Sequence, residues 1–148
     1  MTAIDILLLT YINIMSQRKS VQTPLAPPAL GPYSQAVIAG GFLYISGQLG
    51  IDAAAGSLVE SSKEEQIERI FVNVGHILKA AGCGFGDVVK CTGFLTDMAD
   101  FPLFNSIYAR HFDSPFPARS VFEVSALPKK GAVAELEVIA KMTDNLSF

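Results

Sequence analysis

Apolar residues recur every three or four positions between Ser62 and Gly82, a spacing that predicts a helix with one apolar face. Ser62 and Glu65 form a capping-box pattern, and Gly82 stands where helices commonly end. A second run follows Asp100, which we predict as an N-cap, with Pro102 in the first turn. The apolar residues of that run are Phe101, Leu103, Phe104, Ile107, Tyr108 and Phe112. The pattern therefore predicts two amphipathic helices.

The other apolar runs are short and rich in β-branched and aromatic residues, which is typical of strands. Residues 36–47 contain two such runs around Gly40 and Gly41, a two-residue hairpin pattern. Residues 87–98 predict a buried strand, and residues 119–127 and 132–142 predict two more, joined by a turn at PKKG. The predicted order is β-β-α-β-α-β-β, an α+β domain with both helices on one face of the sheet.

The N-terminal residues differ from this pattern. The apolar run in residues 1–15 contains Asp5, is shorter than a bilayer requires, and lacks the basic start and the cleavage site of a signal peptide. We expect residues 1–22 to be an extension outside the fold, residues 23–143 to form a single domain, and residues 144–148 to be a C-terminal tail. The proline-rich start of the domain, TPLAPPALGP, predicts an extended arm.

Composition and charge narrow the classes of function. The 148 residues suit one domain, and half of them are hydrophobic. The net charge of −3 comes without the clustered Lys and Arg that nucleic acid or an anionic membrane would attract, so we expect neither as a partner. Cys83 and Cys91 have no metal-ligand spacing. They predict free thiols in a reducing compartment, the cytoplasm, with the mitochondrion as the alternative.

Two features that could suggest ligand sites do not support one. The glycine-rich GCGFG at residues 82–86 follows a helix and precedes a strand, the reverse of the order in a dinucleotide-binding loop. It therefore predicts the end of a helix and a turn. His76 and His111 lie in predicted helices without a second ligand nearby in the sequence, so no metal site is predicted.

The charged residues of the last two predicted strands could form either an ion pair or a ligand site. Alternation places Arg119, Val121 and Glu123 on one face of their strand, and Glu135 and Glu137 on one face of the next. If the PKKG turn makes the strands neighbours, these charges can form one patch. They would be either a solvated cross-strand ion pair, worth about 0.2–1 kcal/mol, or a site for a small acid. Arginine binds carboxylates in bidentate fashion and a glutamate can activate water, but spacing alone does not decide.

Four stretches resemble the Rid family of reactive intermediate deaminases, also called the YjgF or L-PSP endoribonuclease family. They are GPYSQAVIAGGFLYISGQ, AAGCGFGDVVKCTGFLTDMADFPLFNSIYARHF, FPARSVFEVSALPK and AELEVIA, in the family's order over about residues 26–140. The combination of GPYSQA, SGQ and PARS is highly specific. The resemblance implies a chorismate-mutase-like fold in a homotrimer, with the sheets in a central barrel, the helices outside and the sites between subunits.

The resemblance also implies an activity. It is the hydrolysis of reactive enamines and imines, such as 2-aminoacrylate and 2-iminobutyrate, to 2-keto acids and ammonia, with no metal or cofactor. Two alternatives stay open. One is an endoribonuclease or translation inhibitor, and the other is a non-catalytic trimer that binds small carboxylates as a regulator or chaperone.

The family's functional residues are carried over onto matching motifs. Arg119 of PARS would clamp the substrate carboxylate, and Glu135, which opens ELE, would hold or activate the attacking water. Tyr33 of GPYSQ would close the pocket. Asn105 would line the cleft, and Gly47 of SGQ would contribute backbone contacts to the substrate.

One site position departs from the family pattern. Val121 stands at a substrate-binding position where many members have cysteine. No thiol chemistry is therefore expected there, while the arginine and the glutamate needed for deamination are retained.

Overall fold

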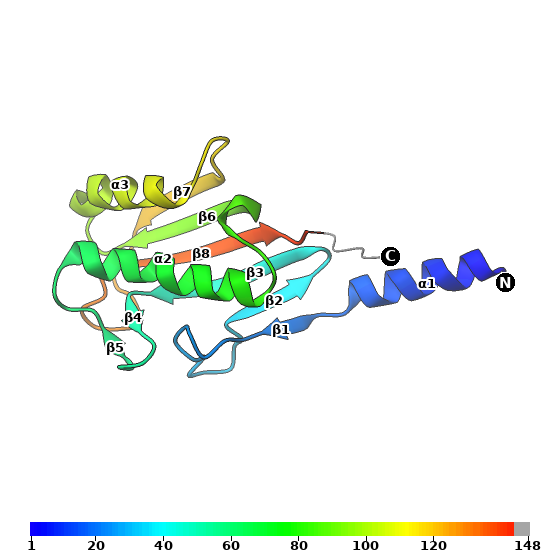
Figure 1. Ribbon diagram of the computed structural model, residues 1–148. Helices are drawn as coiled ribbons and strands as arrows, with labels where there is room; N and C mark the ends of the chain where they lie inside the picture. The colour runs from blue at the N-terminus through cyan, green and yellow to red at the C-terminus, as the bar shows by residue number, and fades with distance from the viewer. Residues whose placement is uncertain (144–148) are drawn as a thin grey trace.

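The structure of the chain is a computed structural model, and its main element is a six-stranded sheet (Figure 1). The structure describes residues 1–143, with the backbone alone for residues 11 and 13–16, and the predicted tail at residues 144–148 lies outside the described part. The strand order is β1-β2-β3-β8-β6-β7. The strands are β1 (Lys19–Val21), β2 (Ala36–Ala39), β3 (Phe42–Leu49), β6 (Val88–Leu95), β7 (Ala118–Glu123) and β8 (Ala134–Lys141).

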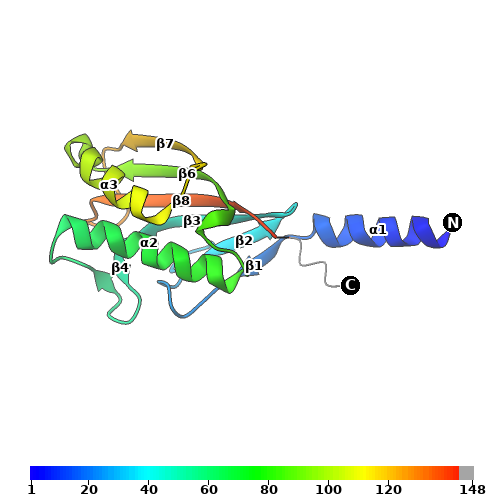
Figure 2. The ribbon, with the colours of Figure 1, turned by 45° about the horizontal axis from the view of Figure 1, so that its top comes forward.

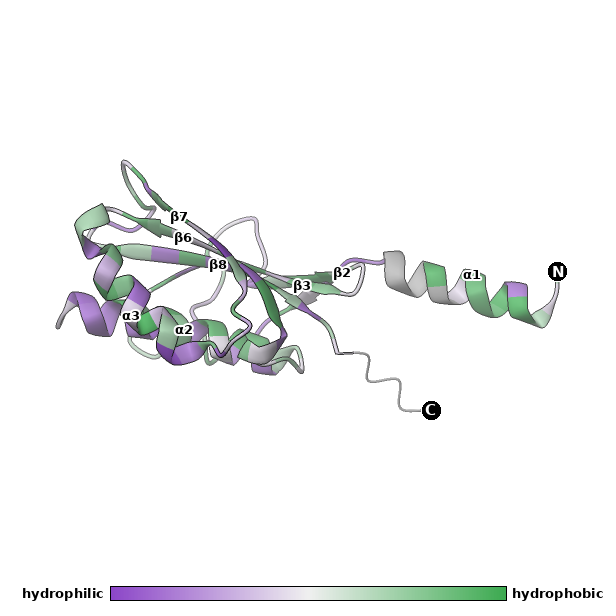
Figure 3. Cartoon of the chain, turned by 90° about the horizontal axis from the view of Figure 1, so that it is seen from above, coloured by the Kyte–Doolittle hydropathy of each residue, from purple (hydrophilic) through white to green (hydrophobic). Residues whose placement is uncertain are grey.

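Helices α2 (Lys63–Ala80) and α3 (Phe101–His111) pack on one face of this sheet, as predicted (Figures 1 and 3). Helix α2 begins at the predicted cap, because Ser62 Oγ accepts a hydrogen bond of 3.1 Å from the Glu65 backbone N–H. The other half of the predicted capping box differs, since the Glu65 carboxylate binds Ser61 Oγ. It ends at Ala80 with Ala81 as its C-cap, and the next residue, Gly82, has a φ of +77°, the left-handed conformation that favours glycine. A mixed α+β fold is therefore confirmed.

The start of α3 differs from the prediction. Asp100 occupies the N-cap position, but its side chain makes no capping hydrogen bond. A short 3-10 turn, η2 (Met98–Asp100), precedes the helix, and there the side chain of Asp97 accepts from the Ala99 N–H at 2.9 Å. The Asp100 carboxylate instead binds Lys63 Nζ at 2.8 Å, which joins the starts of the two helices.

PKKG forms a turn, as predicted, in which the Ala132 N–H donates to the Lys129 carbonyl at 3.1 Å. The strands on either side of it are not neighbours, however, so the condition for one charged patch is not met. Strand β6 lies between them and pairs in parallel with β7 and antiparallel with β8. Helix α3 connects β6 to β7, and a helical crossover is what makes two successive strands parallel. Strand β8 then fills the space between β3 and β6. The hairpin of β2 and β3 does turn at Gly40 and Gly41, as predicted.

The two faces of the sheet differ in cover. On β8, Ala134, Leu136, Val138 and Ala140 are buried against the helices, while Glu135, Glu137 and Ile139 point to the other side. No helix in the described part of the chain covers that other side, which we call the open face (Figure 3). Large aromatic side chains are exposed at Tyr44 and Phe122, on strand positions that alternate with the helix-facing ones.

The N-terminal extension enters the sheet earlier than expected. Helix α1 (Ala3–Ser16) extends away from the sheet (Figure 2), but β1 pairs with β2 as an edge strand, with Ser20 opposite Val37. Residues 19–21 are therefore part of the sheet. Val21 is buried at the edge of the hydrophobic core, which favours this pairing. Within residues 1–143, no helix has the length and apolar character needed to cross a bilayer.

Two smaller elements complete the chain. A two-stranded ribbon of β4 (Ile51–Asp52) and β5 (Ser57–Leu58) follows β3, and a 3-10 turn, η1 (Phe85–Asp87), precedes β6. Cys83 and Cys91 are both free thiols.

Candidate functional site

Arg119 lies on the edge strand β7 and points to the helix side of the sheet. It stands opposite the buried Cys91 of β6. Its guanidinium lies over the Tyr108 ring, 4.4 Å from Cζ to the ring centroid, and donates a hydrogen bond of 2.8 Å to Asn105 Oδ1. Asn105 and Tyr108 are three residues apart on α3 and therefore share one helix face. We call Arg119, Asn105 and Tyr108 the arginine cluster.

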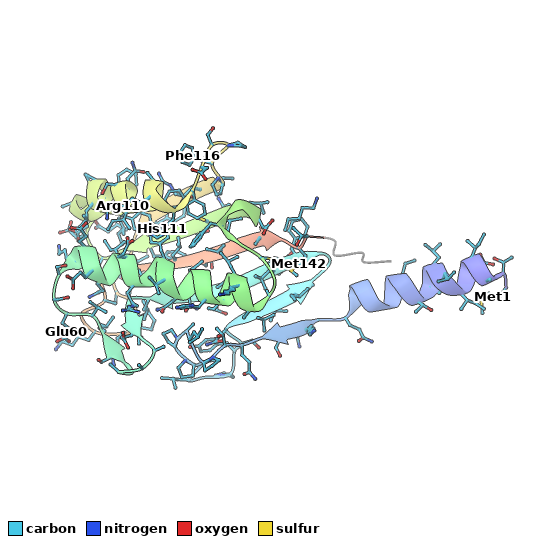
Figure 4. The ribbon with its side chains drawn as sticks, in the orientation of Figure 1. Met1, Glu60, Arg110, His111, Phe116 and Met142 are labelled. Carbon is cyan, nitrogen blue, oxygen red and sulfur yellow. The ribbon has the colours of Figure 1, made fainter. Side chains whose placement is uncertain are left out.

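A pocket of about 370 Å³ adjoins this cluster. Its lining residues are Asn105, Tyr108, Ala109, Phe116, Pro117 and Arg119. Phe116 lies on the loop between α3 and β7 (Figure 4) and is largely exposed. Val121, two residues after Arg119 on β7, packs toward the core beside Gly93. The arginine thus lies among aromatic and aliphatic side chains at a pocket that is open to solvent.

Neighbouring groups leave the charge of Arg119 uncompensated. Burial raises the pKa of the Cys91 thiol to about 11 and also raises the pKa of the Tyr108 phenol, so both are neutral near pH 7. Among the side chains that the structure describes, the ion pairs do not include Arg119. Its partner Asn105 is a neutral amide that accepts through its carbonyl oxygen. This arrangement suits the binding of an anion such as a carboxylate.

Glu135 lies on the open face, on β8 between Leu49 of β3 and Phe94 of β6. Its Oε1 lies so close to Gly47 that an added Cβ at residue 47 would collide with it. The pKa of the Glu135 carboxyl is raised above its usual range, mainly by burial and to a smaller extent by the nearby negative charge of Glu137. A half-buried carboxylate with a raised pKa is a better proton acceptor than an ordinary surface glutamate.

Tyr33 approaches Gly47 from the proline-rich arm. Both residues line a pocket of about 320 Å³ between the arm, β3 and β4. The two segments are joined by hydrogen bonds from Ser46, whose Oγ donates to the Ser34 carbonyl at 2.6 Å and whose N–H donates to the Gln35 carbonyl at 3.0 Å. Gly47 borders both this pocket and the Glu135 side chain, and we call Tyr33, Gly47 and Glu135 the glutamate cluster.

The structure therefore brings the predicted site residues together in two groups rather than one. The arginine cluster lies on the helix side of the sheet, and Glu135 points to the open face, because β8 alternates it with the buried Ala134 and Leu136. The single patch expected for Arg119 and Glu135 does not form within one chain.

Tyr108 was not predicted as a residue of the candidate site, because in the sequence it is one of the apolar residues of a helix face. The available signal was its position three residues after Asn105 on the same helix. His111 is accounted for structurally, since its Nε2 lies 3.1 Å from Glu68 Oε1 and its ring stacks on Phe71 with centroids 4.5 Å apart. In the described part of the chain, no three acidic, histidine or cysteine side chains gather as metal ligands would.

Comparisons with known proteins agree with these motifs. The family model for endoribonuclease L-PSP matches residues 23–142. A Bos taurus protein named 2-iminobutanoate/2-iminopropanoate deaminase is 51% identical over 123 residues, which cover 83% of this chain and 89% of that protein.

Solved structures have the same fold. RidA from the Antarctic bacterium Psychrobacter sp. is 44% identical with a TM-score of 0.79, covering 84% of this chain and 99% of that one. Escherichia coli TdcF with bound serine is 36% identical with a TM-score of 0.78, covering 84% and 99%. The chain belongs to the endoribonuclease L-PSP family, which is the Rid family that its motifs resemble.

Proposed function

We propose that this protein hydrolyses reactive 2-imino and 2-enamino acids, such as 2-iminobutanoate and 2-aminoacrylate, to 2-keto acids and ammonia. The observation that carries the proposal is the uncompensated guanidinium of Arg119, held by Asn105 and Tyr108 beside an open pocket. The names of its relatives support the same reaction, and the serine bound to TdcF is a small amino acid with a carboxylate. A cytoplasmic location is part of this proposal.

The complete site would be composite, formed between copies in a homotrimer. Arg119 lies on β7, which is an edge strand and can therefore reach the surface of a neighbouring copy. Glu135, Gly47 and Tyr33 lie on the open face and the adjoining arm, where a neighbour can approach. The exposed Tyr44 and Phe122 on the open face also favour burial against another copy.

The arginine cluster and the glutamate cluster would have different roles in the reaction. Arg119 of one copy would bind the substrate carboxylate through two N–H groups and so orient the adjacent C=N carbon. Glu135 of the neighbouring copy would accept a proton from water as the water oxygen adds to that carbon. That proton passes to the imine nitrogen and gives the carbinolamine. The hydroxyl group then loses its proton as the C–N bond breaks, nitrogen takes up a proton, and ammonia leaves with the 2-keto acid. An enamine first gains a proton on its β-carbon and loses one from nitrogen, which gives the imine.

The other site residues would shape this reaction without taking part in bond making. Asn105 holds Arg119 in place, Val121 borders the cluster as an inert aliphatic group, and Gly47 gives the Glu135 carboxylate room. Tyr33 would close over the bound substrate from the arm.

The test uses 2-iminobutanoate generated in place by a threonine dehydratase, with release of ammonia and 2-ketobutyrate as the measurement. We expect wild-type protein to accelerate release, Arg119→Ala to abolish the acceleration, and Glu135→Gln to reduce it while leaving binding of a small 2-keto acid intact. A wild-type protein that binds keto acids but gives no acceleration would instead support the non-catalytic trimer. Salt-dependent RNA cleavage without imine hydrolysis would support the ribonuclease.

A further inference from the structure

Gln35 is a buried amide that hydrogen-bonds the proline-rich arm. Its side chain is only 4% exposed. Its Oε1 accepts from the Thr23 N–H at 2.7 Å, and its Nε2 donates to the carbonyls of Thr23, Ala26 and Pro27 at 3.1, 3.1 and 2.8 Å. Within the described part of the chain, these four contacts are the hydrogen bonds that join residues 23–32 to the body.

The chemistry of the arm explains why a glutamine is needed. Prolines at positions 24, 27, 28 and 32 remove backbone donors, so the arm cannot pair with the sheet as a strand. Its inward carbonyls still require donors, and Thr23 still requires an acceptor. A primary amide offers both at one place, whereas a carboxylate offers acceptors only.

Tyr33 directly follows the arm, and its N–H donates a hydrogen bond of 2.8 Å to the carbonyl of Gly31 in the arm. Residues of the arm line two pockets. One, of about 670 Å³, is lined in part by Thr23 and Pro28. The other, of about 320 Å³, lies between Pro27 of the arm and Gly47 of β3. Tyr33 lines both and is 55% exposed, so its own packing fixes it weakly. After Tyr33 the backbone is held by the hydrogen bonds from Ser46 to Ser34 and Gln35. Before Tyr33, its position in the pocket depends on how the arm is held.

We propose that Gln35 is a positioning residue, whose buried amide fixes the arm so that Tyr33 keeps its place in the pocket that it shares with Gly47. This inference rests on the proposed function for its consequence in catalysis, since Tyr33 would close the site. The placement of Tyr33 can, however, be measured without any substrate.

The first measurement uses a fluorescent reporter at residue 33. The chain contains no tryptophan, so Tyr33→Trp introduces a single one at an exposed ring position. In that background, Gln35→Met keeps the side-chain length and removes all four hydrogen bonds. We expect a red-shifted emission maximum and a lower anisotropy at residue 33, because the released arm moves into solvent.

Gln66 provides a matched control. It is also a buried glutamine, 5% exposed, and its amide also binds loop backbone, accepting from the Val133 N–H and donating to the carbonyls of Val59 and Gly131. Gln66→Met should lower the thermal midpoint to a similar degree, yet leave the reporter unchanged. An equal change of the reporter in both variants would reduce the effect to general destabilisation and overturn the proposal.

Gln35→Glu adds a pH-dependent fluorescence change at residue 33, which is predicted by the donors and acceptors around Gln35 and not by a general loss of stability. The buried carboxylate would face three carbonyl oxygens, so its charged form is disfavoured. Of the residues that line the two adjoining pockets, Lys129 is the charged one. When the pH falls, the protonated acid regains one O–H donor, and the reporter should move back toward its wild-type signal. Gln35→Met should show no such return.

Activity connects placement to function. In chains with Tyr33 intact, Gln35→Met should lower kcat/KM for 2-iminobutanoate by about 10- to 100-fold, as displaced site groups do, while Gln66→Met retains more. An unchanged reporter, or a displaced reporter with wild-type kcat/KM, overturns the positioning role. Failure of the proposed function would look different, since wild-type protein itself would then show no turnover.

Discussion

Arg119 and Glu135 lie on opposite faces of the same sheet, with β6 between their strands. Arg119 stands opposite Cys91 on the helix side, and Glu135 stands opposite Phe94 on the open face. A side chain on one face of a continuous sheet cannot meet one on the other face. If both residues act on one substrate, they must come from different copies of the chain.

This separation predicts complementation between two inactive variants. In the proposed homotrimer, assemblies that contain both Arg119→Ala and Glu135→Ala chains should regain activity, because some interfaces pair an intact Arg119 from one chain with an intact Glu135 from the next. For random mixing of equal amounts, roughly a quarter of the interfaces are intact, so about a quarter of the wild-type rate is expected. The measurement is 2-ketobutyrate release after the two chains are co-expressed and purified together.

The control for this experiment pairs Arg119→Ala with the double variant Arg119→Ala, Glu135→Ala. Such mixed trimers contain no chain with Arg119 intact and should stay inactive. If the first mixture also stays inactive although mass analysis shows mixed trimers, the composite site is wrong.

The close approach of Gly47 and Glu135 gives a second prediction. In Gly47→Ala the new methyl group would occupy the position of the Glu135 carboxylate, so the side chain must move. We expect kcat to fall by about 10- to 100-fold, as a misplaced catalytic group does. Stopped assays of 2-iminobutanoate hydrolysis would measure this loss.

Gly86→Ala is the appropriate control for that substitution. An added Cβ at Gly86 meets no atom within 4 Å, and this glycine does not have a positive φ. It changes glycine to alanine in open space and should leave kcat unchanged. A Gly47→Ala protein with wild-type kcat would mean that the position of Glu135 does not matter.

The two helices could be predicted from sequence because their signals are local. The apolar face of α2, its Ser62 cap and its Gly82 end depend on residues within a few turns of each other. The neighbours of each strand could not be predicted, because pairing joins residues far apart in the chain. The placement of β6 between β7 and β8 results from the α3 crossover rather than from the PKKG turn.

The site shows the same division. Family motifs predicted Arg119 and Glu135 as site residues, and alternation placed Arg119 and Val121 on one face correctly. The arginine's contact with Tyr108 and the arm's dependence on Gln35 are tertiary, so periodicity gave them no distinct signal. Asp100 had the right residue type for a cap, but Lys63, 37 residues away, binds its carboxylate instead.

The raised pKa of Glu135 predicts a pH dependence. The residue accepts a proton only when ionised, so kcat/KM should fall as pH decreases through its pKa, and this acid limb should lie above the usual range for a glutamate. Glu137→Gln removes the like charge that helps to raise this pKa, so the limb should move to lower pH. Rates of 2-iminobutanoate hydrolysis, corrected for uncatalysed hydrolysis at each pH, would measure the shift.

Glu60→Gln makes the same change in net charge on the exposed loop between β5 and α2 (Figure 4). It should leave the limb in place. An acid limb that is unmoved by Glu137→Gln, or moved equally by Glu60→Gln, would argue against titration of Glu135 as its origin.

The hydrogen bond from Arg119 to Asn105 predicts how substrate affinity can be weakened without removal of the arginine. In Asn105→Asp the neutral amide oxygen becomes a carboxylate oxygen at the same distance, so the guanidinium gains an internal anionic partner. The substrate carboxylate must then compete with it. A hydrogen bond to a charged group contributes about 1.5–3 kcal/mol, so KM should rise by about 10- to 100-fold while kcat changes less.

Ser106→Asp adds the same charge at the next, exposed position of α3 and serves as the control. Its KM should stay close to the wild-type value, because the new carboxylate lies on a different side of the helix from Asn105 and Tyr108. Steady-state kinetics at fixed ionic strength distinguish the two variants. If both raise KM equally, the effect is a general electrostatic one. If Asn105→Asp alone does so, Arg119 is the group that receives the substrate carboxylate.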